Sequence, residues 1–160
     1  GILYAGLIAT EDGPKVIEFN ARFGDPETQV ILPRLKSDLV EVVQHVLWGR
    51  DFELEWTEES ALGVVLAANG YPEDGYEKGA VIKGLGYISE DMYVYHAGTA
   101  KNDYGEFITN GGRVLLVTAL GSSIEVAKKK VYQELETIQC KGLFYRHDIG
   151  EKATVPSLIE

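Results

Sequence analysis

The sequence predicts an α+β protein in which a β-hairpin with helices is followed by a small, β-rich, barrel-like domain that carries one packed helix. Two apolar runs separated by a turn dipeptide open the chain, and a run of helical period follows them. After residue 58, short β-like runs alternate with glycine-rich turns, and one amphipathic segment interrupts them. Short β-rich runs between turns indicate strands, whereas apolar residues at helical spacing indicate helices.

The first expected element is a β-hairpin. Residues 2–10 and 14–19 are rich in apolar and β-forming side chains, and Glu11, Asp12 and Gly13 lie between them. An Asp-Gly dipeptide favours a tight turn because glycine tolerates a positive φ angle. The two runs are therefore expected to pair as neighbouring strands.

Two helices are expected after the hairpin. Asp25 is a candidate N-cap and Pro26 suits the first helical position, so a short helix should begin there. A clearer helix is predicted over residues 38–48, because its apolar residues recur at helical spacing. Asp38 and Glu41 form a capping-box pattern at its start.

A domain boundary is expected between residues 57 and 58. The connection over residues 50–60 contains five acidic residues, which indicates an exposed segment. We therefore divide the chain into domains 1–57 and 58–160. The helix of the second domain should follow Ser122 and Ser123. The strands expected in this domain are residues 61–68, 76–85, 92–98, 113–120 and 142–149.

Composition narrows the class of protein. The chain has 160 residues, of which 45% are hydrophobic, and a formal net charge of −10. This acidity repels nucleic-acid phosphates and anionic lipid, so neither is an expected partner, although the same charge also simply keeps a protein soluble. Cys140 is the single cysteine, which excludes an internal disulfide and fits a reducing, cytoplasmic compartment. No stretch approaches the ~20 apolar residues of a membrane helix.

The segment that ends the hairpin carries the chemistry. Alternate side chains of a strand share a face, so Glu18 and Asn20 should point together while Ile17 and Phe19 face a core on the other side. A carboxylate and an amide oxygen form the hard-oxygen site that magnesium prefers, with nucleotide phosphates and water as its other ligands. Arg22 follows, and its planar fork suits a phosphate.

The bare pattern Glu-x-Asn-x-Arg leaves a second interpretation open, an exposed strand end at which Arg22 pairs with Asp25. The longer string is more specific. Residues 18–29, Glu-Phe-Asn-Ala-Arg-Phe-Gly-Asp-Pro-Glu-Thr-Gln, closely resemble the signature of the phosphoribosylamine–glycine ligase (glycinamide ribonucleotide synthetase) family of the ATP-grasp superfamily. Further segments resemble the C-terminal domain of this family: residues 96–99, 111–115, 144–146 and 148–150.

The resemblance implies a fold and a reaction. Residues 1–57 would form the end of an ATP-grasp domain, and residues 58–160 would form a small domain of the rudimentary hybrid motif type. Members of the family join glycine to 5-phosphoribosylamine through glycyl phosphate, with ATP as co-substrate, in purine biosynthesis. The partners implied are therefore these three small molecules.

The resemblance also implies roles for single residues. Glu18 and Asn20 match the Mg²⁺ or Mn²⁺ ligands of the family, and Arg22 matches its catalytic arginine beside the acyl phosphate. Arg146 is expected to hold a phosphate of substrate or nucleotide. The alternative for Arg146 is an exposed ion pair with Asp148.

Two rival functions are weighed against this one. Another ATP-grasp carboxylate–amine ligase, or a biotin-carboxylase-type enzyme, is disfavoured by the string Phe-Gly-Asp-Pro-Glu at residues 23–27. The other rival is a non-catalytic, stand-alone binding module. The chain opens directly on a strand-like run and its only methionine is Met92, so we expect a fragment of a longer protein. It contains no nucleotide-cradling glycine loop, so the fragment alone is expected to be inactive.

Overall fold

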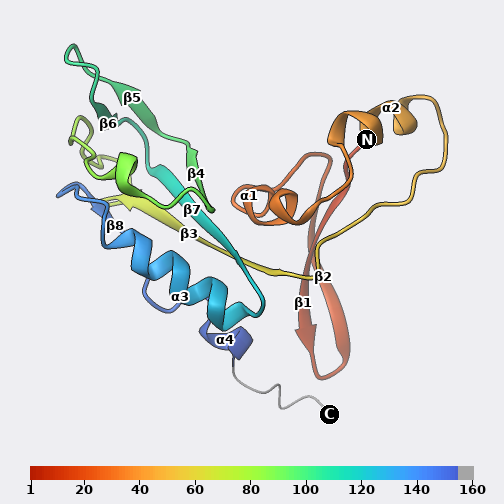
Figure 1. Cartoon of the computed structure of the whole chain (residues 1–160). Helices are drawn as coiled ribbons and strands as arrows, with labels where there is room; N and C mark the ends of the chain where they lie inside the picture. Colours follow the sequence, from red (N-terminus) through yellow and green to blue (C-terminus); the bar gives the residue numbers. More distant parts are fainter. Residues whose placement is uncertain (155–160) are drawn as a thin grey trace. The chain divides into compact units, whose positions relative to one another are not determined.

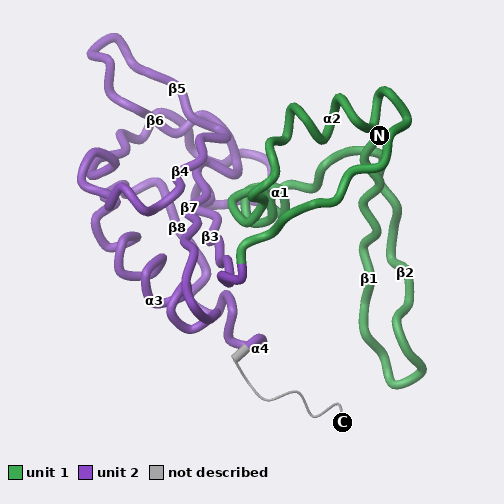
Figure 2. The backbone as a smooth tube through the Cα atoms, turned by 45° about the vertical axis from the view of Figure 1, so that its right-hand side comes forward, with its two compact units in different colours: residues 1–57 green, residues 58–160 purple. Residues whose placement is uncertain are grey.

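The computed structural model describes residues 1–154 and confirms the α+β class predicted from the sequence (Figure 1). The chain divides into two compact units, residues 1–57 and residues 58 onward (Figure 2). A hairpin and short helices make up the first unit, whereas the second contains the larger sheet and the longest helix.

The first unit opens with the predicted hairpin. Strands β1 (Tyr4–Thr10) and β2 (Gly13–Asn20) pair antiparallel around the expected Asp-Gly turn. The register shifts between Gly6 and Leu7, which marks a bulge. The hairpin is therefore confirmed, with an irregularity that the sequence did not reveal.

The short helix after the hairpin begins later than predicted. Helix α1 (Thr28–Ile31) starts two residues after Pro26, and Asp25 accepts a hydrogen bond from the Gln29 side chain instead of capping the helix. The physical reason is a preceding turn, in which the carbonyl of Gly24 accepts hydrogen bonds from both the amide and the hydroxyl of Thr28. The short 3-10 turn η1 (Leu32–Arg34) follows.

The second helix of this unit forms as predicted. Helix α2 (Leu39–Leu47) is capped by Asp38, whose Oδ1 accepts hydrogen bonds from the amides of Val40 and Glu41 over 2.7 and 3.2 Å. These bonds satisfy two of the amides that a helix start leaves without a partner.

The first unit has no apolar core of its own. Ile17 and Phe19 are 66% and 62% exposed, and Val16 is 53% exposed. The expectation that Ile17 and Phe19 face a core is thus wrong for the described part of the chain. Every buried hydrophobic side chain in residues 1–154 belongs to the second unit. An isolated two-stranded hairpin is only marginally stable in water.

The second unit is built on an antiparallel four-stranded sheet. The strands, in their order across the sheet, are β4 (Met92–His96), β7 (Arg113–Gly121), β3 (Ser60–Ala68) and β8 (Leu143–Phe144). A separate two-stranded ribbon is formed by β5 (Thr99–Lys101) and β6 (Phe107–Thr109). Over the residues that the structure describes, these sheets stay open and do not close into the expected barrel.

One expected strand is replaced by irregular chain. Within residues 76–85, Val81 and Lys83 make only isolated bridges, and the segment ends in the 3-10 turn η2 (Leu85–Tyr87). Gly79 and Gly84 adopt φ angles of 89° and 90°, which interrupt an extended backbone.

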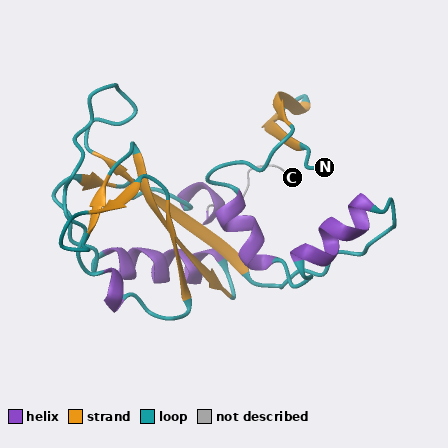
Figure 3. Ribbon diagram, turned by 90° about the horizontal axis from the view of Figure 1, so that it is seen from above, coloured by secondary structure: helices purple, strands orange, loops and turns teal. Residues whose placement is uncertain are grey.

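Helix α3 (Ile124–Leu135) covers one face of the four-stranded sheet (Figure 3). Ser123 caps its start by accepting a hydrogen bond from the amide of Val126. Its inward residues Ala127, Val131 and Leu135 are buried with side chains of β3 and β7 in the main core. The short helix α4 (Glu151–Thr154) follows β8, and no described helix is long and apolar enough to cross a membrane.

Candidate functional site

The candidate site lies at the end of β2 in the first unit. Glu18 and Asn20 share one face of this strand, and Nδ2 of Asn20 donates a hydrogen bond to Oε1 of Glu18 over 3.0 Å. Glu18 is exposed and Asn20 is half-buried. The structure therefore brings the predicted carboxylate and amide into direct contact.

The opposite strand leaves room for this pair. Gly6 lies opposite Glu18 and Tyr4 lies opposite Asn20 in the hairpin register. A methyl group built on Gly6 would lie 3.2 Å from Cγ of Glu18, which is closer than ordinary van der Waals contact. Glycine at position 6 thus leaves enough space for the Glu18 side chain to lie against the opposite strand.

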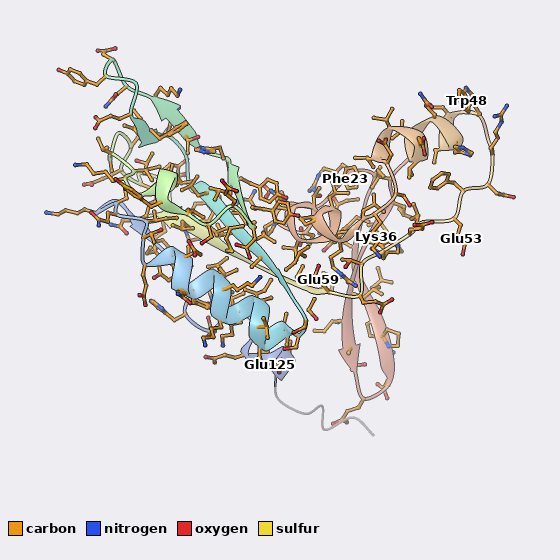
Figure 4. The ribbon with its side chains drawn as sticks, in the orientation of Figure 1. Phe23, Lys36, Trp48, Glu53, Glu59 and Glu125 are labelled. Atoms are coloured by element: carbon orange, nitrogen blue, oxygen red, sulfur yellow. The ribbon has the colours of Figure 1, made fainter. Side chains whose placement is uncertain are left out.

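Arg22 follows in the turn after β2. Its Nη1 donates a hydrogen bond to the carbonyl of Phe23 over 2.9 Å, and Figure 4 labels Phe23 in this segment. A guanidinium carries several N–H donors in one plane, so this single contact does not use all of them. Arg22 is therefore held to the backbone of the turn that directly follows the Glu18–Asn20 pair in the sequence.

Tyr4 and Glu27 complete the group. The hydroxyl of Tyr4 donates a hydrogen bond to Oε1 of Glu27 over 3.4 Å. The pKa of Tyr4 is raised above its ordinary value chiefly by the charge of Glu27, with a further contribution from Glu18, while Arg22 acts in the opposite direction. Sequence analysis did not select Tyr4, and the only available signal was its expected place opposite the end of β2.

The donor set fits a divalent cation that is shared with a phosphate. Glu18 and Asn20 supply one carboxylate and one amide oxygen, which are the hard ligands that Mg²⁺ prefers. Within residues 1–154, His, Cys, Asp and Glu side chains form no group of three that could hold a metal by themselves. A cation at this pair would therefore take most of its ligands from phosphate oxygens and water.

Arg146 belongs to the second unit and is paired there. Its Nε and Nη2 donate hydrogen bonds to Oδ1 and Oδ2 of Asp148 over 2.8 and 2.5 Å. This bidentate contact raises the pKa of Arg146 and lowers the pKa of Asp148. The geometry corresponds to the exposed ion pair that the sequence left open as the alternative for Arg146.

The ion pair borders a shallow hollow. The turn after β8 is tied to α3 by Tyr132, whose hydroxyl donates to the carbonyl of Arg146 and accepts from the amide of Ile149 over 2.7 and 3.1 Å. The hollow has a volume of about 410 Å³, and its lining includes Arg146 and Lys152. The carboxylates of Asp148 and Glu151 also line this hollow, so its two cationic side chains are matched by two acidic ones.

Two family models match separate parts of the chain. Residues 61–152 match the model of the phosphoribosylglycinamide synthetase C domain. Residues 1–28 match the model of the phosphoribosylglycinamide synthetase ATP-grasp (A) domain. The second match contains β1, β2 and the Glu18–Asn20 pair.

Curated relatives share the same family name. The phosphoribosylamine–glycine ligase of Halalkalibacterium halodurans is 61% identical over 153 residues, which cover 96% of this chain and 35% of that protein. The ligase of Listeria innocua is 53% identical over 154 residues, which cover 96% of this chain and 36% of that protein. The chain thus spans about a third of the length of these relatives.

Solved structures show the same fold. The crystal structure of phosphoribosylamine–glycine ligase from Thermotoga maritima matches with a TM-score of 0.79 and 39% identity, over 92% of this chain and 36% of that one. The biotin carboxylase domain of Hydrogenobacter thermophilus 2-oxoglutarate carboxylase matches with a TM-score of 0.60 and 19% identity over 88% of this chain and 32% of that one, a likeness of fold alone. Because the C-domain model covers more than half of its residues, the chain belongs to the phosphoribosylglycinamide synthetase family.

Proposed function

We propose that this chain is the C-terminal part of a phosphoribosylamine–glycine ligase, which joins glycine to 5-phosphoribosylamine at the expense of ATP. The observation that carries the proposal is the contact between Glu18 and Asn20 inside the family-like string of residues 18–29. In this reaction the glycine carboxylate attacks the γ-phosphate of ATP, which forms glycyl phosphate and releases ADP. The amine of phosphoribosylamine then displaces the phosphate.

Glu18 and Asn20 would hold the Mg²⁺ or Mn²⁺ that accompanies ATP. When bound, the ion supplies positive charge that balances the phosphate oxygens as the phosphoryl group moves. The two side chains orient one another through their 3.0 Å hydrogen bond, so their oxygens are placed before any ligand arrives. The exposed position of Glu18 leaves it accessible to a nucleotide.

Arg22 would stabilise the negative charge that develops on the transferred phosphoryl group. A guanidinium stays protonated at all physiological pH values and can donate two parallel hydrogen bonds to one anion. Its contact with the Phe23 carbonyl restrains the side chain close to the end of β2. Arg22 is thus the proposed catalytic residue, and Arg146 is proposed to hold a phosphate of substrate or nucleotide.

The two units correspond to two proposed domains. We assign residues 1–57 to the end of the ATP-grasp domain and residues 58–160 to the small C-terminal domain. The family matches at residues 1–28 and 61–152 support this division. The exposed apolar faces of the hairpin support it too, because they would be covered by the remainder of the ATP-grasp domain.

Cytoplasmic location is proposed with this function, because ATP and the other substrates are metabolites of that compartment. The isolated chain is expected to be inactive, since it spans about a third of its relatives. The test is an assay of the full-length enzyme for ADP release in mixtures that lack one substrate each. Multiple-turnover release that requires both glycine and phosphoribosylamine supports the proposal, and multiple-turnover release at an undiminished rate without either substrate refutes it.

A further inference from the structure

Tyr4 is connected to both ends of the segment that carries Arg22. Its backbone lies opposite Asn20 in the hairpin register, and its hydroxyl reaches Oε1 of Glu27 over 3.4 Å. Residues 21–26 lie between these two points of attachment. One side chain therefore closes the loop that presents Arg22 at the end of β2.

Gly24 allows Glu27 to fold back over this loop. A methyl group built on Gly24 would lie 2.5 Å from Oε2 of Glu27 and 3.1 Å from its Cδ, so the carboxylate occupies the space that a larger residue would fill. Gly24 is buried, and its carbonyl accepts hydrogen bonds from the amide and the hydroxyl of Thr28 over 3.1 and 2.5 Å. The carboxylate thus packs directly on the backbone that it helps to hold.

Tyr4 restrains Glu27 as a hydrogen-bond donor, because its hydroxyl donates to Oε1 of that carboxylate over 3.4 Å. Oε2 of Glu27 accepts no hydrogen bond from any described residue, so Tyr4 is the side chain that restrains this carboxylate.

We propose that Tyr4 and Glu27 form a clamp that sets the position of Arg22 relative to the Glu18–Asn20 pair. Tyr4 is then a positioning residue for phosphoryl transfer, and the inference rests on the proposed function. Phosphoryl transfer depends on placement within a fraction of an ångström, so a loosened loop lowers the rate even when all charged groups remain. The clamp affects the chemical step more than the binding of ATP.

The first test is Tyr4→Phe in the full-length enzyme, which removes only the hydroxyl. We expect kcat to fall roughly three- to tenfold, with KM for ATP and the melting temperature nearly unchanged. Amide hydrogen exchange over residues 21–26 should become faster, a change that does not depend on the assay. Tyr104→Phe is the matched control, because Tyr104 is 89% exposed and lies in the second unit.

Variants of the partner separate a clamp from a purely electrostatic role. Glu27→Gln keeps an oxygen that accepts from Tyr4 and should retain most of kcat, whereas Glu27→Ala should behave like Tyr4→Phe. Gly24→Ala displaces the carboxylate and should also lower kcat. The double variant Tyr4→Phe/Gly24→Ala should be no slower than the slower single variant, because both changes open the same contact.

The outcomes distinguish this inference from the proposed function. Wild-type kcat in Tyr4→Phe, or equal losses in Glu27→Gln and Glu27→Ala, would overturn the clamp while the wild-type enzyme still makes product. A wild-type enzyme that releases ADP without glycine would overturn the proposed function instead. Faster exchange over residues 21–26 together with a selective fall in kcat would support the clamp.

Discussion

Asn20 lies beside Glu18 and donates its Nδ2–H to Oε1 of that carboxylate over 3.0 Å. The amide of Asn20 thereby limits the orientations of the Glu18 carboxylate. Oδ1 of Asn20 remains available as a second oxygen ligand for a cation. A site assembled in this way loses part of its order as well as one ligand when Asn20 is truncated. The contact therefore makes Asn20 as informative a target as Glu18.

Asn20→Ala in the full-length enzyme is expected to raise the Mg²⁺ concentration that gives half-maximal activity by about tenfold or more. The cause is the loss of one oxygen ligand and of the hydrogen bond that orients Glu18. Steady-state rates across a Mg²⁺ titration measure the change. Asn110→Ala, at an exposed position of the second unit, is the control. An unchanged Mg²⁺ requirement in Asn20→Ala would contradict a metal-binding role and leave Asn20 as an exposed residue at the end of the strand.

Arg22→Lys is expected to lower kcat more than it raises KM for ATP. Lysine keeps the charge but replaces a planar fork by a single ammonium group, and the difference matters most when charge develops on the phosphoryl group. Separate kcat and KM values from initial rates provide the test. Arg50→Lys in the connection between the units serves as the control. A kcat of Arg22→Lys equal to that of the wild type would contradict the catalytic role and leave Arg22 with a structural role only.

Arg146→Ala tests whether the second unit contributes to phosphate binding. If Arg146 holds a phosphate, KM for phosphoribosylamine or for ATP should rise about tenfold or more, because a charge-assisted hydrogen bond is lost. Asp148→Asn is the matched variant, since it removes the negative charge and one of the two oxygens that pair with Arg146 and leaves the guanidinium in place. If both KM values of Arg146→Ala shift by less than about twofold, Arg146 does not hold a phosphate and only forms the ion pair with Asp148.

His96 gives the second unit a pH-dependent stability. Partial removal from water lowers the pKa of His96 below its ordinary value of 6.5, and its ring lies 4.5 Å from the ring of Phe107. Because the folded pKa is the lower one, the unfolded chain takes up the proton first as the pH falls. The stabilisation by neutral His96 is complete above the unfolded pKa and declines as the pH falls through it.

The measurement for His96 is the melting temperature of the 160-residue chain between about pH 7.5 and about pH 5.5. His96→Gln should show a smaller decrease over this range than the unmodified chain. His45→Gln, in the first unit, should retain the full decrease. An identical pH dependence in His96→Gln and the unmodified chain would contradict the assignment.

Elements controlled by local residues were predictable from the sequence. Asp12 and Gly13 specify the hairpin turn, and Asp38 specifies the start of α2. The pairing of Glu18 with Asn20 follows from the alternation of a strand. These features depend on neighbours within a few residues, so a single sequence contains the information.

Features that depend on distant parts of the chain were not predictable. The contact between Tyr4 and Glu27 joins residues 23 positions apart, and the bulge at Gly6 depends on how two strands align. The expected strand over residues 76–85 had suitable apolar residues, but two glycines with positive φ angles interrupt it. The expected start of α1 at Pro26 failed because Gly24 first bonds with Thr28.

The most direct test of the account is the formation of glycinamide ribonucleotide by the full-length enzyme and its Glu18→Gln variant at saturating Mg²⁺. Glutamine keeps the shape of the side chain but removes the charge that would hold the ion, which is often worth several kcal/mol in the transition state. We predict that the wild-type enzyme forms product from glycine, phosphoribosylamine and ATP, and that Glu18→Gln loses about a hundredfold or more in kcat with an unchanged melting temperature. Near-normal kcat in Glu18→Gln would contradict the account.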